Sequence, residues 1–100
     1  MRPYQRGAQG EYYIMNILKS KGYKVLRSSG SHTPIDIIAS RDGFILAIQS
    51  KKEEVKVLSV YDKEKLVEWA YAFRATPVLA SKREGRWIFT YVETGFRVIP

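Results

Sequence analysis

Apolar positions change from helical to strand spacing over the first quarter of the chain. Ile14, Ile17 and Leu18 recur at intervals of three and four residues, which is typical of one face of a helix. The β-rich run that follows is closed by a polar segment with two glycine or proline breakers. The pattern predicts a helix over Ala8–Lys21, a short strand over Tyr23–Arg27 and then a loop.

Two further apolar runs predict a β-hairpin. Ile35–Ser40 and Phe44–Ser50 are separated by a short polar segment that ends in Asp42-Gly43. Asp-Gly between alternating apolar residues is the strongest short signal for such a turn. Apolar residues occur on both sides of the hairpin, so we expect both faces of its sheet to be covered.

The length of this turn decides which side chains meet. With a two-residue turn, Asp36 lies opposite Gln49, and Lys51 projects from the same side. A three-residue turn shifts the register and places Ile48 or Ser50 opposite Asp36 instead. The first geometry gathers three polar groups at one end of the hairpin.

The second half predicts one more helix and two or three more strands. Asp62 is a suitable N-cap for a helix that runs to about Arg74. The segment before this helix is charged and then β-like at Val55, Val57 and Leu58. After the helix, the pattern predicts strands over Pro77–Ser81 and Arg86–Val92 with a charged turn at 82–85 between them. A short edge segment is expected over Phe96–Ile99. The expected fold class is α/β (α+β), with a central mixed, mostly antiparallel five-stranded sheet flanked by helices.

The second helix is apolar on nearly all sides, interrupted only by Glu68. Such a helix is normally buried on more than one side, and one sheet covers only one of them. We therefore expect a homodimer, with an interface formed by Leu66, Trp69, Ala70 and Phe73. The alternative is a core helix that its own chain covers loosely.

The amino-acid composition limits the classes of function that this chain can have. One hundred residues predict a single domain over 1–100, and the formal net charge of +7 favours a polyanionic partner. Without cysteine and with one histidine, thiolate catalysis and Cys- or His-rich metal sites are excluded. No apolar run approaches the length of about 20 residues that crosses a bilayer, so we expect a cytoplasmic protein without a membrane partner.

The polar end of the hairpin has the layout of a metal-dependent phosphodiesterase half-site. A carboxylate such as Asp36 binds a hard cation through oxygen, and the Gln49 amide oxygen is a second ligand. Lys51 would then stabilise charge on the phosphate or orient the attacking water. Glu11, on the first helix, is a further candidate ligand.

An ordered set of short motifs resembles the archaeal Holliday-junction resolvases, members of the PD-(D/E)xK nuclease superfamily. The motifs are Arg6-Gly7-Ala8-Gln9 with Glu11, Val25-Leu26-Arg27-Ser28 with Gly30-Ser31, Ile35-Asp36-Ile37-Ile38-Ala39, Ile48-Gln49-Ser50-Lys51, and Pro77-Val78-Leu79-Ala80 with Trp87. The resemblance implies a restriction-endonuclease-like fold and a homodimer. It also implies an Mg²⁺-dependent endonuclease, with Mn²⁺ as a possible substitute and no small-molecule cofactor, that nicks branched DNA symmetrically at four-way junctions.

The same resemblance implies roles for individual residues. Glu11, Asp36 and Gln49 would be metal ligands, Lys51 the catalytic lysine, and Ser31 an active-site residue. Arg27, like Ser31, would contact phosphate or the active site by this resemblance, and Arg6, Lys52, Lys82 and Arg83 are further basic residues that we expect to contact DNA. Position 49 departs from the family, because glutamine replaces glutamate and lowers the negative charge around the metal by one.

This substitution leaves three activities open: a junction resolvase, a junction- or duplex-binding protein that does not cleave, and a nuclease with a QxK motif that acts on linear duplex. A purely structural Asp36–Lys51 ion pair is the alternative to a metal site. Lys82, Arg83 and Arg86 either bind the DNA backbone or simply solubilise a turn.

Overall fold

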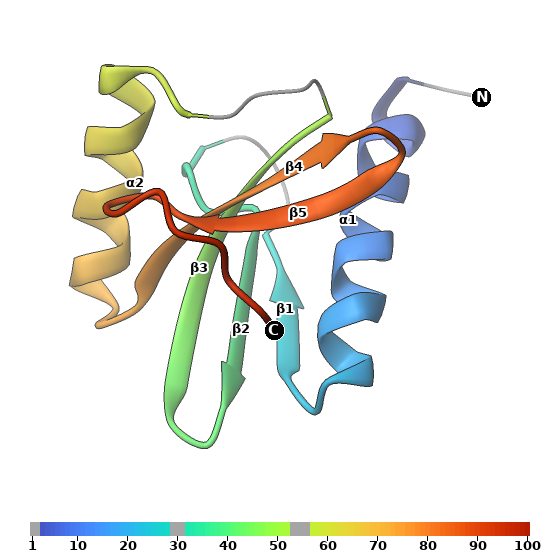
Figure 1. The fold of residues 1–100 in the computed structure, drawn as a ribbon, viewed down its shortest axis with the longest axis horizontal. Coiled ribbons are helices and arrows are strands. Elements are labelled where there is room, and N and C mark those ends of the chain that lie inside the picture. The colour runs from blue at the N-terminus through green and yellow to red at the C-terminus, as the bar shows by residue number, and fades with distance from the viewer. Residues whose placement is uncertain (1–2, 29–31, 53–56) are drawn as a thin grey trace.

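The computed structural model describes residues 3–28, 32–52 and 57–100, with side chains from Gly10 onward. Five strands form one sheet in the order β1-β2-β3-β4-β5, in which β3 and β4 are parallel and the other neighbours are antiparallel (Figure 1). This arrangement confirms the expected mixed, mostly antiparallel sheet. The elements are α1 (Pro3–Ser20), β1 (Lys24–Arg27), β2 (Ile37–Arg41), β3 (Phe44–Lys51), α2 (Val60–Ala72), β4 (Thr76–Arg83) and β5 (Arg86–Tyr91).

The first helix begins earlier than predicted and ends where the sequence indicates. After Ser20 the backbone N–H of Gly22 donates to Lys19 O, and that of Tyr23 donates to Leu18 O. This pair of hydrogen bonds needs a left-handed residue, and Gly22 has φ +91°. The chain therefore turns sharply from α1 into β1.

The hairpin between β2 and β3 has the predicted two-residue turn. Asp42 and Gly43 both have positive φ, 54° and 80°, as a type I′ turn requires. Arg41 consequently faces Phe44, and the pairing continues regularly to Ile37 opposite Ile48.

The start of α2 corrects the prediction of its cap. Ser59 is the N-cap, and its side chain accepts a hydrogen bond of 3.2 Å from the N–H of Asp62, which lies within the helix. Val57 and Leu58 are not in a strand, and Val55 lies outside the described residues.

The last two strands also differ from prediction in their ends. β4 continues through Lys82 and Arg83, so these residues belong to the sheet and only Glu84-Gly85 form the turn. The expected edge segment near the C-terminus contributes a single β-bridge, between Arg97 and Thr90.

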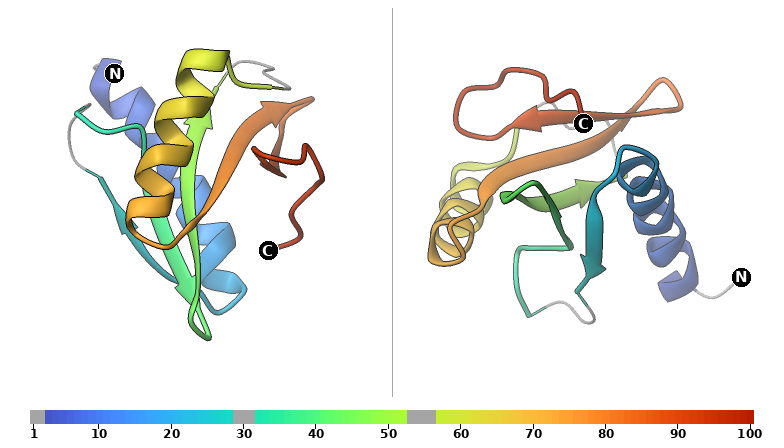
Figure 2. Two further views of the ribbon diagram at one scale, coloured as in Figure 1. Left: turned by 90° about the vertical axis from the view of Figure 1, so that its left-hand side faces the viewer. Right: turned by 90° about the horizontal axis from the view of Figure 1, so that it is seen from below.

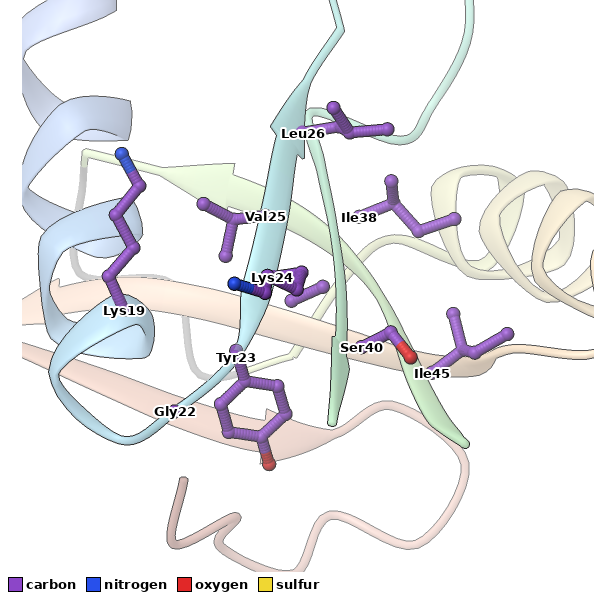
Figure 3. Close-up of a pocket in the computed structure, with 10 residues that line it drawn as sticks. Lys19, Gly22, Tyr23, Lys24, Val25, Leu26, Ile38, Ser40 and Ile45 are labelled. Carbon is purple, nitrogen blue, oxygen red and sulfur yellow. The ribbon is translucent and has the colours of Figure 1, made fainter. Parts of the chain in front are cut away.

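The two helices cover opposite faces of the sheet (Figure 2). α2 packs on β3 and β4 through a small buried cluster, whose members are Ile35, Ala47, Leu66, Ala70 and Ala75. Towards β1 the same face is open: Leu26 is 71% exposed, beside a groove of about 780 Å³ that follows β1 (Figure 3). The expectation that both faces are covered is thus met only in part.

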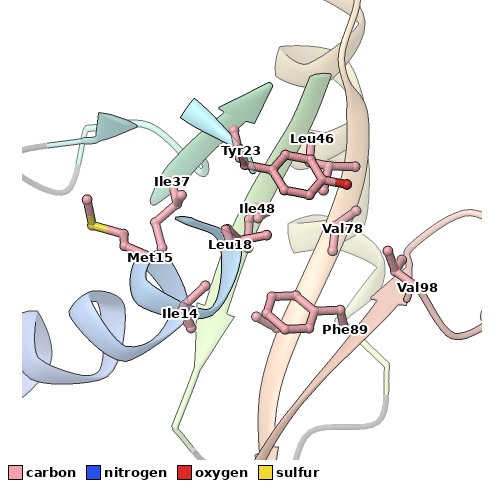
Figure 4. Packing of buried hydrophobic residues seen from close by; sticks show 12 residues of the cluster. Ile14, Met15, Leu18, Tyr23, Ile37, Leu46, Ile48, Val78, Phe89 and Val98 are labelled. Carbon is pink, nitrogen blue, oxygen red and sulfur yellow. The ribbon is translucent and has the colours of Figure 1, made fainter. Parts of the chain in front are cut away.

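On the other face, α1 packs against the sheet through the larger cluster (Figure 4). Ile14 and Leu18 of α1 are fully buried, and Phe89 of β5 closes the cluster from the far side. This contact fixes α1, and with it Glu11, relative to the strands. Neither helix in the described residues is both long and apolar enough to cross a membrane.

Candidate active site at the open end of the hairpin

Asp36 lies where the regular pairing of β2 with β3 stops. Its N–H donates to Ile48 O at 2.8 Å, although Ile48 is already the partner of Ile37, so the register breaks at this residue. Its carboxylate oxygen Oδ2 accepts from Ser50 N at 2.7 Å and from Ser50 Oγ at 3.1 Å. The expectation that Asp36 lies directly opposite Gln49 is therefore wrong. The carboxylate instead lies against the β3 backbone that carries Gln49.

The surroundings of Asp36 act on its pKa in opposite directions. Burial raises the pKa above its ordinary value, because desolvation penalises the charged form. The two Ser50 hydrogen bonds lower it, as do the positive charges of Lys51 and Arg27, but burial prevails. The second oxygen, Oδ1, has no hydrogen bond within the described parts of the chain. Asp36 is thus a partly buried carboxylate with one oxygen held and one available.

Gln49 and Lys51 project from the same face of β3, as strand alternation predicts. The Gln49 oxygen Oε1 is buried and has no hydrogen-bond partner among the described residues. Lys51 Nζ lies 3.8 Å from Asp62 Oδ2, at the start of α2. The lysine therefore has a carboxylate neighbour other than Asp36, and the predicted ion-pair alternative does not account for Asp36.

Ser81 is a neighbour of Lys51 that the sequence did not reveal. It is the β4 partner of Lys51, is fully buried, and its Oγ has no hydrogen-bond partner in the described ranges. A buried polar group without a partner costs about 1–3 kcal/mol, so Gln49 Oε1 and Ser81 Oγ are candidates for binding a polar ligand beside Lys51. Only the long β3-α2-β4 crossover brings Ser81 here, and no local pattern predicts its register.

Glu11 forms an ion pair with Arg27, and its role as a metal ligand stays a prediction. Its Oε1 lies 2.6 Å from Arg27 Nε, and the two side chains are 18% and 32% exposed. The preceding residue, Gly10, brings this turn of α1 against the end of β3: a Cβ at Gly10 would lie 3.2 Å from the Trp87 ring and 3.7 Å from Lys52 Cε. Glu11 is therefore close to the end of β3 while one of its oxygens is held by Arg27.

The predicted DNA contacts are distributed around this end of the sheet. Arg27 holds Glu11, and Lys52 lies beside Gly10. Lys82 is exposed on β4. Arg83 follows it directly, so the Arg83 side chain projects from the opposite face of the sheet, together with that of its β5 partner Arg86. The side chains of Arg6 and Ser31 lie outside the described residues.

Two oxygen atoms at the ends of β2 and β3 are of the kind that a hard divalent cation prefers. Asp36 Oδ1 and Gln49 Oε1 are oxygen donors without partners in the structure as described, and the second is buried. The described ranges hold no group of three or more His, Asp or Glu residues suited to a metal ion. Two such donors, one of them neutral, are thus identified among the described residues, and the role of Glu11 as a further ligand stays a prediction.

Comparison with known proteins identifies the family. A family model described as archaeal Holliday junction resolvase (Hjc) matches residues 2–96. The chain belongs to this family. The crossover junction endodeoxyribonuclease Hjc of Methanocaldococcus jannaschii is 32% identical over 88 residues, an alignment covering 86% of this chain and 65% of that protein. The chain thus spans slightly less than two thirds of the length of that relative.

A solved structure supports the same family assignment. The Holliday junction resolvase Hjc of Archaeoglobus fulgidus, an archaeal hyperthermophile, superimposes with a TM-score of 0.73 at 29% identity, covering 86% of this chain and 77% of that one. The resemblance inferred from the short motifs is thereby confirmed, as is the fold class. Membership of a nuclease family also implies a divalent metal ion.

Proposed function

We propose that this member of the Hjc family is an endonuclease that cuts four-way DNA junctions symmetrically, with Mg²⁺ as its metal and as a homodimer. The observation that carries the proposal is the anchored carboxylate of Asp36. Ser50 holds one of its oxygens, and the adjacent β3 residues supply an unpartnered amide oxygen and the Lys51 ammonium group. Carboxylate, amide and ammonium groups gathered at one strand end suit phosphodiester hydrolysis.

The chemistry assigns a task to each side chain. A bound Mg²⁺, held by Asp36 and Gln49, would polarise the scissile phosphate and acidify a water molecule. Ser50 holds Oδ2 of Asp36 through two hydrogen bonds, which limits the orientations that the carboxylate can take. Lys51 offsets the negative charge that develops on the phosphate in the transition state. The products would carry 5′-phosphate and 3′-hydroxyl ends.

Symmetric cleavage needs two active sites, and the open part of the α2 side offers a surface for pairing. Phe73 is 54% exposed and Leu26 71% exposed, on either side of a groove of about 230 Å³. The groove is lined by Leu26, Arg27, Ser28, Thr33, Ile35, Ile38, Trp69 and Phe73. An apolar surface of this kind on a small protein commonly marks an interface.

This surface corrects the predicted interface. Leu66 and Ala70 are both fully buried against the chain's own sheet, so they are unavailable to a partner. Of the four predicted residues, Trp69 and Phe73 remain, and their rings stack at a centroid distance of 6.5 Å. We place the interface at these two rings together with Leu26.

A charge introduced into the groove tests this dimer. Phe73→Glu should convert the dimer to monomer in light scattering while the far-UV circular dichroism stays unchanged. Tyr61→Glu is the matched control, since Tyr61 lies in the first turn of the helix that Phe73 caps, is aromatic and 69% exposed, and does not line the groove. A Phe73→Glu protein that remains folded and dimeric would exclude this surface.

One observation favours a second function, junction binding without cleavage. The Glu11 carboxylate is engaged by Arg27, and position 49 is neutral, so Asp36 is the one carboxylate of the predicted trio that is free of an ion pair in the described structure. Metal affinity falls as ligand charge falls. In this case the net charge of +7 would supply the affinity for DNA.

A nicking assay separates the candidates. The protein is incubated with a labelled synthetic four-way junction, and in parallel with linear duplexes of the same arm sequences, in Mg²⁺ and in Mn²⁺. Paired nicks on opposed junction strands support the proposal. Binding without nicks in either metal supports the second function, and cleavage of the linear duplexes at equal rate indicates a nuclease that does not recognise branching.

A further inference from the structure

Three arginines line one groove on the β4-β5 side of the molecule. The groove has a volume of about 450 Å³ and is lined by Arg83, Glu84, Arg86, Ile88, Thr90, Gly95 and Arg97. Arg83 and Arg86 face each other across the two strands, and Arg97 is brought in from the C-terminal segment by its bridge to Thr90. We call Arg83, Arg86 and Arg97 the arginine groove.

The strand register places this groove on the same face of the sheet as Lys51. Lys51 pairs with Ser81, and Ser81 pairs with Ile88 of the groove. Paired residues project from one face, and so does Arg83, two residues beyond Ser81. A ligand that lies along the groove can therefore continue towards Lys51 without crossing the sheet.

The distance between the arginine groove and Lys51 suits a bound nucleic acid. Two steps between neighbouring strands, each about 4.8 Å, place Ile88 about 10 Å from Lys51. That distance equals roughly three base-pair steps of 3.4 Å along the axis of a DNA duplex. The groove thus begins a few nucleotides from the candidate catalytic lysine.

No ion pair joins the guanidinium groups of the groove to another described residue. Arg86 and Arg97 form no ion pair within the described residues, and Arg83 Nε is buried without a hydrogen-bond partner there. Each guanidinium presents donors in a geometry that matches phosphate oxygens. A groove with three such cations and one lining carboxylate, Glu84, is electrostatically suited to an anion.

We propose that the arginine groove binds the phosphate backbone of one DNA arm and directs it towards Lys51. This rests on the proposed function in taking DNA as the partner, and it extends that function by assigning Arg86 and Arg97 to arm binding. Arg83 has the same role. The contacts are to phosphate, so they position an arm and do not read its sequence.

The experiment measures binding separately from cleavage. Wild type and the double variant Arg86→Ala/Arg97→Ala are titrated into a fluorescent four-way junction in Ca²⁺, over a range of salt concentrations. The Kd should rise by about tenfold at physiological salt, and the slope of log K against log salt should fall by about two, since each phosphate that an arginine neutralises contributes about 0.9. Nicking of sub-saturating junction in Mg²⁺ should slow in step with the weaker binding, because the arm is held less tightly.

Two variants control for charge. Lys19→Ala/Lys21→Ala removes the same two charges at the end of α1, beside the Asp42-Gly43 end of the sheet, and should change the slope by much less. Arg86→Lys/Arg97→Lys keeps the charge and should preserve the slope. If both alanine doubles lose affinity equally, the groove is part of a general positive field; if neither does, it does not touch DNA. Either result overturns the inference.

Binding and nicking together distinguish failure of the arginine groove from failure of the proposed nuclease function. A wild-type protein that binds junctions without nicking them, yet loses affinity in Arg86→Ala/Arg97→Ala, keeps the groove and removes the nuclease. Normal nicking with unchanged binding in the variant removes only the groove.

Discussion

The two ends of the β2–β3 hairpin contrast sharply. At the closed end, Asp42-Gly43 form a tight turn and each residue of β2 has a regular partner in β3. At the open end the pairing breaks at Asp36, a carboxylate is partly buried, and Gln49 Oε1 lies buried without a hydrogen-bond partner in the described chain. Both ends carry an aspartate, but only one aspartate is desolvated.

The two ends of the hairpin differ in how much their aspartate is expected to destabilise the folded protein. An exposed aspartate in a turn serves the backbone and costs little. A desolvated carboxylate beside an unpartnered amide oxygen destabilises the folded protein unless a ligand compensates. Such local instability in an otherwise regular hairpin is characteristic of functional sites.

The largest effect is expected when the same substitution is made at each end of the hairpin. Asp36→Asn should abolish junction nicking, a loss of at least about 10²–10³-fold, because a metal ligand and its charge are removed. Junction binding should persist. Asp42→Asn is the matched control, since Asn-Gly suits the same turn, and it should cleave at the wild-type rate. Comparable losses in both variants would remove the distinction between the two ends.

A second test adds charge at the open end. Gln49→Glu should lower the Mg²⁺ concentration needed for nicking by about tenfold, because the ligand set gains a negative charge. Gln49→Ala should raise it. Calorimetric titration with Mn²⁺ gives the same comparison without cleavage, and identical metal titrations for all three proteins would show that position 49 is not a ligand.

The raised pKa of Asp36 predicts a pH dependence of stability. Because burial raises this pKa in the folded state, the folded protein binds the proton more tightly than the unfolded chain. The contribution of Asp36 is therefore most favourable at low pH and is lost as pH rises above 3.8 through the folded-state pKa. Asp36→Asn should gain stability relative to wild type over this range in urea denaturation without metal. A constant difference between the two proteins from pH 3.5 to 7 would contradict it.

Local pattern was enough to predict the closed end, and not the open one. Asp-Gly specifies its turn through backbone preference alone, so the register up to Ile37 followed from the sequence. The break at Asp36 depends on hydrogen bonds to Ser50, which no alternation of apolar residues encodes. Ser81 reaches Lys51 only through the crossover that contains α2.

The predicted interface failed in part for a related reason. The apolar character of α2 showed that the helix is buried on several sides, but not which side its own sheet occupies. Leu66 faces the chain's own core, whereas Phe73 remains exposed. Burial is decided by tertiary packing, and a helical pattern with apolar residues all round leaves the choice open.

The smallest expected effect belongs to the closed end and separates stability from function. Gly43 has φ +80°, and a Cβ there would meet no atom within 4 Å, so Gly43→Ala introduces backbone strain without a clash. The strain should lower the free energy of unfolding by about 1 kcal/mol, because a side chain disfavours the left-handed region. Urea denaturation measures this loss, and the nicking rate of the folded fraction should be unchanged. A Gly43→Ala protein with normal stability but slower nicking would mean that the turn communicates with Asp36 along the two strands, and the two ends of the hairpin would then have to be treated as one functional unit.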